Sequence, residues 1–221
     1  MNNQSAFSVI EFRPPYGNFR FPGQHQDERI FYAARAAKII LMWKAVLICI
    51  IWGLAAIIGA YLMDSLYNSL KFIGQNPSTT GIQKLLIGAG PFLSFLWIIS
   101  FIFAFFWAYA VWHKTIFFVT NKRLTQFVFT TPWTNYQLSL SLDKVVDTAG
   151  ITHSYWQKFL GIGTLFARSA AGAQGDFLVP NIEHTRDLHN WLTKLIYEWE
   201  AASKKGAALT NFKPFDPNWK K

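Results

Sequence analysis

The chain has little that would support covalent or metal chemistry. Its 221 residues include a single cysteine, Cys49, so it cannot form an internal disulfide or a site with several thiolate ligands. None of the five histidines forms an i, i+4 pair, and His184 and His189 are spaced so that they diverge on a helix. A glycine-rich phosphate loop and a nucleophile motif are also missing. These absences predict a protein that is not an enzyme and carries no cofactor or metal.

Charge is missing from two long segments in the first half of the chain, residues 45–63 and 85–112. About 20 apolar residues of helix cross a bilayer core about 30 Å thick, and buried helices of soluble proteins seldom stay uncharged for so long. We therefore expect a transmembrane hairpin within residues 27–112, with crossings at 45–63 and 91–112. The segments also lack the ionisable groups that proton relays, ion paths and intramembrane proteases need, which favours an anchor or assembly surface.

The start of the second crossing depends on Pro91. Residues 85–112 would form a straight helix of about 42 Å, longer than one crossing needs. A proline in the first turn of a helix costs little, because its missing amide hydrogen would have no partner there. We therefore expect the helix to begin at Pro91, with residues 85–90 as an interfacial approach. A longer helix kinked at Pro91 is the alternative.

Acidic residues are few, and the net charge of +9 is carried outside the apolar segments. Basic residues tend to stay on the cytoplasmic side of a membrane, where they attract anionic headgroups. The connection between the segments has only two basic residues, Lys71 and Lys84, whereas basic residues are frequent on the outer flanks of the segments. We therefore predict a multi-pass protein of the cell (inner/cytoplasmic) membrane with both termini in the cytoplasm. The residues expected at the membrane interface are Arg35, Lys38, Trp43, Lys44, Trp112 and Lys114.

Small residues recur at helical spacing in both crossings. Such stripes let two helix backbones approach closely in lipid, where they pair by packing rather than by the hydrophobic effect. The spacing does not tell whether the helices pair within one chain or between chains of an oligomer. The predicted packing residues are Ala56 and Ala60 in the first crossing and Ser100, Ala104 and Ala108 in the second.

The segments before the first crossing predict two elements. Residues 1–26 mix Asn, Gln, Pro and Gly with spaced aromatics, which indicates an extended arm that docks on a surface or partner, or else a poorly ordered terminus. Asp27 then has the character of a helix cap, followed by the run from Ile30 to Lys38. We expect this helix to continue into the membrane.

After His113 the hydrophobic period changes from that of helices to that of strands. Six short strands are expected, at 116–119, 124–129, 136–142, 145–152, 165–169 and 177–182. Gly161 and Gly163 interrupt the chain before the fifth strand, and Gly172 with Gly175 predicts a hairpin turn. A final helix has one apolar face, formed by Leu188, Trp191, Leu192, Leu195, Ile196 and Trp199. Residues 113–200 therefore predict an α+β domain, a curled antiparallel sheet covered by a C-terminal helix.

The order of these elements resembles a known family. Residues Phe118 to Leu124 read Phe-Val-Thr-Asn-Lys-Arg-Leu, residues Leu160 to Leu165 read Leu-Gly-Ile-Gly-Thr-Leu, and both follow a membrane hairpin and precede a closing helix. In these respects the chain, from about Gln26 to Trp199, is similar to bacterial pleckstrin-homology-like (PH-like) proteins of the membrane-flanked type. The resemblance implies a PH-like barrel of antiparallel strands capped by a helix. It does not imply an enzyme. Asn121 tolerates a left-handed backbone and suits the tight turn between the first two strands.

Two groups of basic residues are candidates for contact with anions or lipid. Lys122 and Arg123 follow the first strand of the predicted barrel, where lipid-binding relatives in other kingdoms hold phosphoinositide phosphates. Leu124 and Thr125 stand where a further basic residue would be expected. The sequence therefore favours a general electrostatic contact over a specific site. Lys204 and Lys205 open the basic and aromatic tail, residues 201–221, which suits an anionic membrane or acidic partner, or else a disordered tail.

Together these features predict an integral membrane protein that presents a cytoplasmic PH-like domain as a non-catalytic module for protein or lipid interaction. Its expected partners are membrane lipids and other membrane or cytoplasmic proteins, and self-association into an oligomer is open. Nucleic acid is not an expected partner, because a membrane-tethered tail with so few charges binds it poorly. The alternative is an accessory subunit of a larger membrane transporter, export or enzyme complex, in which the small-residue stripes pack against foreign helices.

Overall fold

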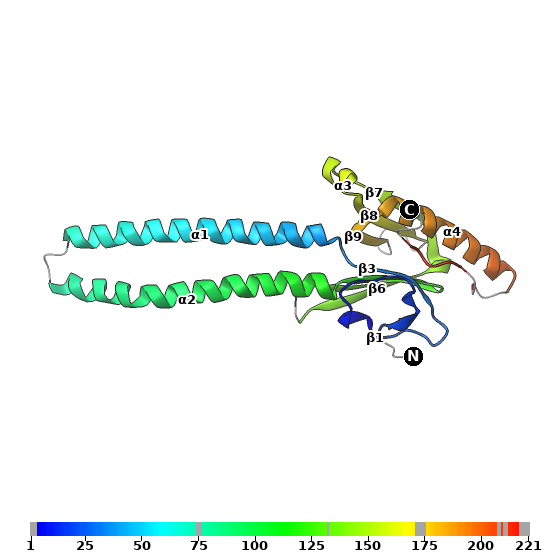
Figure 1. Ribbon diagram of the computed structural model, residues 1–221, viewed down its shortest axis with the longest axis horizontal. Helices are drawn as coiled ribbons and strands as arrows, with labels where there is room; N and C mark the ends of the chain where they lie inside the picture. Colours follow the sequence, from blue (N-terminus) through cyan, green and yellow to red (C-terminus); the bar gives the residue numbers. More distant parts are fainter. Residues whose placement is uncertain are drawn as a thin grey trace. The chain divides into compact units, whose positions relative to one another are not determined.

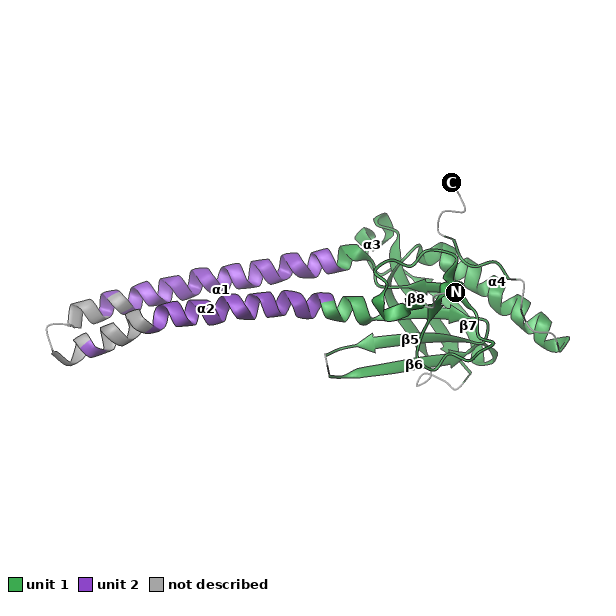
Figure 2. Cartoon of the chain, turned by 60° about the horizontal axis from the view of Figure 1, so that its bottom comes forward, with its two compact units in different colours: residues 1–40, 110–221 green, residues 41–109 purple. Residues whose placement is uncertain are grey.

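The computed structural model describes residues 4–73, 77–131, 133–170, 176–206, 209 and 212–216. The chain divides into two compact units, which are described separately (Figure 2). Unit 1 combines two separated stretches, Met1–Ile40 and Ala110–Lys221, and unit 2 is the segment between them, Leu41–Tyr109. The sheet-rich part of the protein therefore begins before the two apolar segments and resumes after them.

Unit 2 consists of the greater part of two long helices, α1 (Lys38–Ile73) and α2 (Pro77–Lys114) (Figure 1). The prediction of two apolar helices is confirmed. Both are longer than predicted, because they also include most of the expected connection: only residues 74–76 lie between them. Their apolar parts, Lys38–Leu66 and Ala89–Lys114, are long and apolar enough to cross a membrane.

Pro91 lies inside α2, so the prediction that the helix begins there is wrong. The alternative of a longer helix that runs through the proline agrees with the structure in its extent. Proline interrupts a helix because it lacks an amide hydrogen and crowds the preceding turn. Apolar helices of this kind tolerate it when nearby side chains and local adjustments satisfy the freed backbone groups. In the next turn the Ser94 hydroxyl donates to the Gly90 carbonyl oxygen at 2.9 Å.

The first sheet of unit 1 has four antiparallel strands in the order β3 (Ile30–Ala34), β4 (Ile116–Thr120), β5 (Arg123–Phe129) and β6 (Asn135–Ser141). The predicted helix at 30–38 is therefore wrong over most of its length, and α1 begins only at Lys38. Ile30, Phe31 and Tyr32 are all buried. A strand buried on both faces reads as a continuous apolar run, which periodicity does not separate from a helix.

The second sheet has three antiparallel strands, β7 (Val145–Ile151), β8 (Ile162–Ser169) and β9 (Phe177–Glu183). The short helix α3 (Tyr155–Phe159) connects β7 to β8, and the 3₁₀ turn η3 (Leu142–Lys144) leads from β6 into β7. All six predicted strands are present. Within the described residues, however, they and β3 form two sheets and no closed barrel. The predicted turn at Gly172 and Gly175 lies outside the described residues.

The C-terminal helix α4 (Thr185–Lys204) confirms the predicted amphipathic helix. Leu188, Leu192 and Leu195 on its inner face are completely buried in the same core as the strands. Trp191, Ile196 and Trp199 pack at the edge of that core. The helix thus covers apolar surface that the sheets would otherwise expose to water.

The N-terminal arm docks on its own domain. It contains two short strands that pair in parallel, β1 (Gln4–Ser5) and β2 (Phe19–Arg20), and two 3₁₀ turns, η1 (Ala6–Ser8) and η2 (Tyr16–Asn18). Phe21 stacks on Phe118 of β4 with ring centroids 4.8 Å apart, and Phe7 meets Phe127 of β5 edge to face at 5.3 Å. The spaced aromatics are therefore core residues of unit 1.

Part of the predicted C-terminal tail is also packed. The Phe215 amide donates to the Phe31 carbonyl oxygen at 3.1 Å, and the Tyr16 hydroxyl donates to the Phe215 carbonyl oxygen at 3.2 Å. The Phe215 side chain is buried among these residues. Residues 212–216 of the tail therefore belong to the domain, and its first four residues continue α4 to Lys204, whereas Lys220 and Lys221 lie outside the described residues.

Candidate functional site

The chain leaves unit 1 at Ile40 and returns to it at Ala110. Both of these points lie at one end of the sheets (Figure 2). We call this the helix-bearing end and define it as residues 35–40 and 110–115. It brings together Arg35, Lys38, Trp112 and Lys114, four of the six residues predicted for a membrane interface. The other two, Trp43 and Lys44, follow on α1 within unit 2, where their side chains are exposed.

Trp112, near the end of α2, holds the segment that leads into α1. Its indole nitrogen donates to the Ala36 carbonyl oxygen at 2.8 Å, and its ring is buried. On the other side of this segment, the Ala37 amide donates to the Asn181 carbonyl oxygen of β9 at 2.7 Å. The start of α1 is thus tied both to the end of α2 and to the second sheet.

Arg35 links three segments at the same point. Its Nε donates to the His113 carbonyl oxygen at 2.6 Å, and one terminal nitrogen donates to the Ile10 carbonyl oxygen at 2.8 Å. The guanidinium also lies over the Phe12 ring, 4.7 Å from its centroid. Cation–π contact and charge-assisted hydrogen bonds of this kind need a fixed geometry. Arg35 therefore fastens the N-terminal arm to the last turn of α2.

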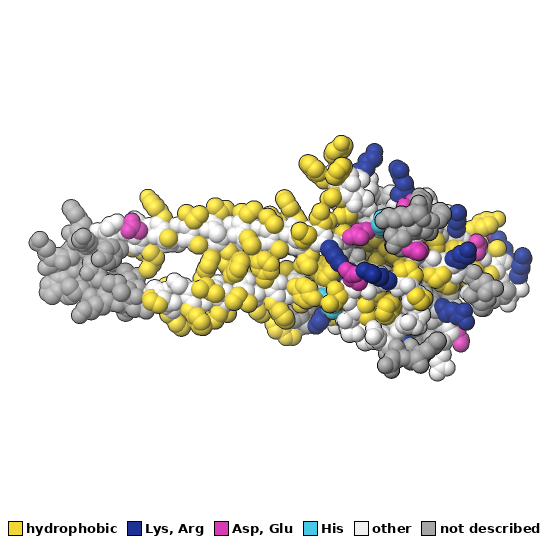
Figure 3. Space-filling model, viewed as in Figure 1, with side chains coloured by type: hydrophobic (Ala, Val, Ile, Leu, Met, Phe, Trp, Pro, Cys, Tyr) yellow, Lys and Arg dark blue, Asp and Glu magenta, His cyan; other side chains and the backbone are white. Residues whose placement is uncertain are grey.

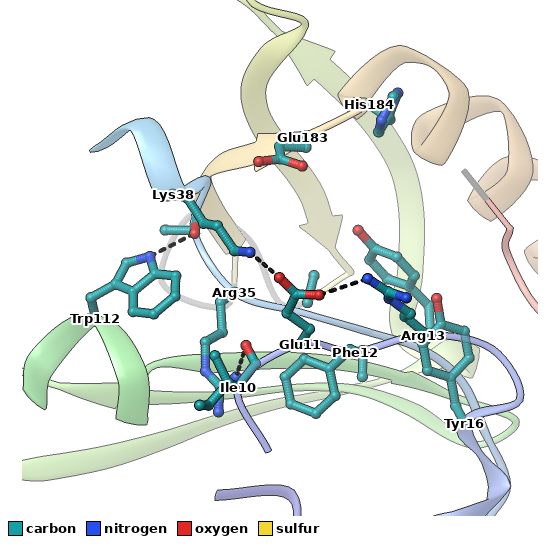
Figure 4. A pocket seen from close by; sticks show the side chains of 14 residues that line it. Ile10, Glu11, Phe12, Arg13, Tyr16, Arg35, Lys38, Trp112, Glu183 and His184 are labelled. Atoms are coloured by element: carbon teal, nitrogen blue, oxygen red, sulfur yellow. Dashed lines mark hydrogen bonds and ion pairs between the residues drawn. The ribbon is translucent and has the colours of Figure 1, made fainter. Parts of the chain in front are cut away.

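Glu11 of the arm forms ion pairs with Lys38 and with Arg13 (Figure 4). The hydrogen bond from Lys38, followed by that from Arg13, holds the pKa of Glu11 below its usual range. Glu11 is therefore an anion at neutral pH. Because both pairs are exposed to water, they orient the arm more than they stabilise it.

A cleft of about 290 Å³ opens beside these contacts (Figure 4). Arg13, Arg35 and Lys38 supply positive charge, and Glu11 and Glu183 supply negative charge. Tyr16 and Tyr32 also line it, and burial raises the pKa of both phenols, so they stay neutral. The described lining pairs no nucleophile with a general base, and its charges are largely matched. This arrangement suits holding segments together better than it suits catalysis.

Arg123, predicted to contact an anion, is bound to a buried carboxylate instead. Its Nε lies 2.9 Å from Oε1 of Glu28, and a terminal nitrogen lies 3.0 Å from Oε2. Burial alone would raise the pKa of Glu28, but hydrogen bonds from Arg123 and Thr120 lower it below its usual value. The guanidinium therefore serves the interior of unit 1. Lys122 beside it is exposed, and its contact with an anion stays a prediction.

The predicted lipid contacts are not gathered at the helix-bearing end. β4 begins next to α2 and runs for five residues to the turn at Lys122 and Arg123, so that turn lies about 15 Å away along the strand. Lys204 and Lys205 lie at the far end of the 20-residue helix α4. Lys204 pairs there with Glu200 at 2.8 Å, which raises the pKa of Lys204.

Asn121 has a role that the sequence did not predict. It is not among the described residues with a left-handed backbone, which outside glycine are Asn181 and His184. Instead its side chain joins the turn to the segment just before β3: Oδ1 accepts from the Arg29 amide at 3.0 Å, and Nδ2 donates to the Asp27 carbonyl oxygen at 3.1 Å. The Thr-Asn-basic-Arg segment is thus a clamp between distant parts of the sequence.

The predicted packing residues of unit 2 divide into two groups. The Ser100 hydroxyl accepts a hydrogen bond from the Trp52 indole nitrogen of α1 at 3.2 Å and donates to the Trp97 carbonyl oxygen at 2.7 Å. Ala104 and Ala108 on the same stripe are partly buried. Ala56 and Ala60 on α1 are exposed. The α2 stripe therefore includes a contact within the chain, and the α1 stripe is open.

Sequence reasoning missed one exposed apolar element, α3. Tyr155, Trp156 and Phe159 are 80%, 69% and 75% exposed, and Leu160 at its end is also exposed. The order Tyr-Trp-x-x-Phe-Leu places these four side chains within one arc of a helix, a signal that was available in the sequence. No element was predicted from the sequence between the fourth strand and Gly161.

Among the described residues, no group of three or more His, Cys, Asp or Glu side chains could hold a metal ion. The site is therefore characterised by its contacts: Arg35, Trp112 and the Lys38–Glu11 ion pair join the arm, the start of α1 and the end of α2. Comparisons with protein-family models, with curated proteins and with solved structures find no match to this chain.

Proposed function

We propose that the chain is an integral membrane protein whose helices α1 and α2 cross a cell membrane and hold unit 1 at the cytoplasmic surface as a non-catalytic interaction module. One observation carries this proposal: in each helix, none of the residues in an apolar stretch of 18 residues is buried within the protein. Figure 3 shows hydrophobic side chains along the described parts of both helices. Exposing such surface to water costs about 25 cal/mol per Å², and a hydrocarbon environment removes that cost.

The lengths and charges of the helices support a crossing with unit 1 inside. The apolar parts of 29 and 26 residues extend about 44 and 39 Å, enough for a core about 30 Å thick with turns left for the headgroup region. Arg35, Lys38 and Lys44 lie near the start of α1, and Lys114 ends α2. By the positive-inside rule, this bias favours unit 1, with both termini, on the cytoplasmic side.

We infer a PH-like fold for unit 1 as the finer description of its architecture. The supporting observations are a four-stranded and a three-stranded antiparallel sheet, formed in chain order and followed by the covering helix α4. The hairpin is inserted between β3 and β4, which are hydrogen-bonded neighbours. A domain anchored through two adjacent strands has less freedom to rotate than one on a single linker. Such a module would present its surfaces to lipid and to protein partners.

An accessory subunit of a larger transporter, export or enzyme complex is the second candidate, and one observation favours it. Ala55, Ala56, Gly59 and Ala60 form an exposed small-residue stripe on α1, and a side-chain carbon added at Gly59 would meet nothing within 4 Å. Small residues at this spacing pack helices against one another in membranes. A foreign helix seated here would make the chain part of an assembly.

Membrane integration and topology are tested on one variant series. Cys49 is replaced by alanine, and Asn68, an exposed residue of α1 beyond its apolar part, is replaced by cysteine. We expect the chain to stay in the membrane pellet after alkaline carbonate extraction, and the new cysteine to react with an impermeant maleimide on intact cells. Release by carbonate would refute the membrane proposal. Labelling only after lysis would reverse the topology.

Purification in mild detergent separates the two candidate functions. A stand-alone module elutes as a chain or homo-oligomer of defined mass. A subunit brings stoichiometric foreign proteins, and that complex should dissociate when Gly59 and Ala60 are replaced by leucine. The matched control is Ile57→Leu, an exchange on the same helix outside the small-residue stripe, which should leave either form unchanged.

A further inference from the structure

The helix α3 exposes its apolar face and turns a polar residue inward. At 100° per residue, Tyr155, Trp156, Phe159 and Leu160 share one arc of the helix, and Gln157 lies opposite. A helix on the surface of a soluble domain turns its apolar arc toward the core. Here the apolar residues are exposed, and Gln157 is the least exposed residue of the helix, with its Oε1 accepting from the His153 amide at 3.0 Å.

The residues that follow α3 are bound to the end of β9. The carbonyl oxygen of Gly161, two residues after α3, accepts from the His184 amide at 2.9 Å, and Ile162 pairs with Glu183. Three residues earlier on the same segment, the Asn181 carbonyl oxygen accepts from Ala37, the residue before α1. Three strand residues extend about 10 Å. The apolar arc of α3 therefore lies close to the point where α1 begins.

A second aromatic protrusion lies beside the other helix. The turn between β5 and β6 carries Trp133, which is 84% exposed. The Phe129 amide at the base of this turn donates to the Thr115 hydroxyl at 3.2 Å, and Lys114 Nζ lies 5.5 Å from the centre of the Phe129 ring. Lys114 is the last residue of α2. In Figures 1 and 2, α3 and this turn both lie at the helix-bearing end of the sheets.

We propose that the aromatic side chains of α3, together with that of Trp133, insert into the interfacial layer of the same membrane that α1 and α2 cross. This inference rests on the proposed function and adds the surface by which unit 1 touches lipid. Tryptophan and tyrosine favour this layer, because it solvates an apolar ring and a polar edge together. Residues 152–161 contain no carboxylate and one cation, Lys158, which suits anionic headgroups.

Continuity with the two helices identifies lipid as the occupant of this surface. Where α1 and α2 enter a bilayer, any apolar group within about 10 Å of the first turn of α1 or the last turn of α2 meets the headgroup layer, whose depth is of similar size. A soluble partner would have to displace the headgroups from this layer to reach the same side chains. The surface thus adjoins the residues of unit 1 at which α1 begins and α2 ends.

The test compares two matched probe positions in the full chain. With Cys49 replaced by alanine, a polarity-sensitive fluorophore is attached to Phe159→Cys or to Tyr197→Cys. These residues are almost equally exposed, at 75% and 74%, but Tyr197 lies on α4 about 18 Å from the start of that helix. Each protein is placed as a single chain in a nanodisc of phosphatidylcholine and phosphatidylglycerol, which removes a second copy as an occupant.

Nitroxide lipids labelled near the headgroup provide the readout. We expect them to quench the probe at Phe159 at least twofold more than the probe at Tyr197, with blue-shifted emission at Phe159 only. Equal quenching at the two positions, with the chain incorporated, would overturn the inference and leave the proposed function intact. A blue shift at Phe159 without quenching by lipid would also overturn it, because protein would then cover the helix. Failure of both chains to enter nanodiscs would instead refute the proposed function.

Discussion

Glu28 and Arg123 form a two-point ion pair across the insertion that separates them in sequence, with Nε–Oε1 at 2.9 Å and a terminal nitrogen to Oε2 at 3.0 Å. The carboxylate side chain is completely buried and that of the arginine is 20% exposed. The Thr120 hydroxyl adds a third contact to Oε1 at 2.8 Å. Removing one partner of such a pair leaves the other charge without its counterion, which is far costlier than losing an exposed pair.

Replacing Glu28 with glutamine should therefore lower the free energy of unfolding by about 3 kcal/mol. The measurement is urea unfolding of the detergent-solubilised protein, followed by tryptophan fluorescence. Glu200→Gln is the matched control, because Glu200 pairs with Lys204 on the exposed face of α4. That change should cost less than about 1 kcal/mol. Equal losses of unfolding free energy in the two variants would show that the buried pair stabilises the fold no more than the exposed pair.

The same pair predicts how stability depends on pH. Because the folded pKa of Glu28 lies below its ordinary value of 4.5, the folded state binds this proton less readily than the unfolded state does. Its contribution is fully present above that value and is lost as pH falls through the folded pKa. Unfolding titrations from about pH 6 to pH 3 should show a smaller loss for Glu28→Gln than for the parent chain. Parallel curves would contradict the assignment.

Gly163 occupies a position where a side chain has no room. A Cβ there would lie 2.9 Å from the Ile151 carbonyl oxygen and 3.0 Å from Thr185 Oγ1. Backbone oxygen cannot move aside without disturbing the β7–β8 pairing, so Gly163→Ala should cost about 2 kcal/mol of unfolding free energy. Gly17→Ala is the control, because nothing lies within 4 Å of its added carbon and its φ is not left-handed. A neutral result at Gly163 would refute this packing argument.

The sequence predicted the elements whose patterns are local. The six strands after His113 and the helix α4 have periodicities and turn residues that need no knowledge of the rest of the chain. β3 was misread because its four buried residues, Ile30 to Ala33, are consecutive and show no period, and its partner β4 lies beyond the whole hairpin. No local pattern specifies a pairing across that distance.

The same difference between local patterns and long-range contacts applies to the residues of the candidate site. Trp112, Arg35 and Lys38 were predicted from the preference of aromatic and basic residues for the ends of apolar helices. Their contacts with Ile10, Glu11 and the carbonyl groups were not, because these depend on where the arm docks. Arg123 looked like an anion-binding residue because its counterion, Glu28, lies 95 positions earlier.

The hydrogen bond between Trp52 and Ser100 should contribute to pairing of the two helices. Hydrogen bonds between apolar helices in bilayers are worth about 0.6 kcal/mol on average, so Ser100→Ala should lower hairpin stability by about that amount. Ser94→Ala is the matched control, because that hydroxyl bonds only within α2. Steric trapping or force unfolding of the reconstituted protein measures the difference. An equal effect of both changes would mean that the contact between the helices adds nothing.

Trp112 should matter far more than Trp43, although both are tryptophans near the ends of apolar helices. The Trp112 indole donates to the Ala36 carbonyl oxygen at 2.8 Å from a buried ring, whereas the Trp43 ring is exposed. Phenylalanine keeps most of the apolar contact but leaves that carbonyl without its donor, at a cost of about 1 to 2 kcal/mol. Trp112→Phe should therefore lower the free energy of unfolding, measured by urea titration, by that amount. Trp43→Phe should change this free energy by less than about 0.5 kcal/mol. If the two substitutions were equally harmless, the hydrogen bond at Ala36 would not be what ties α2 to the start of α1.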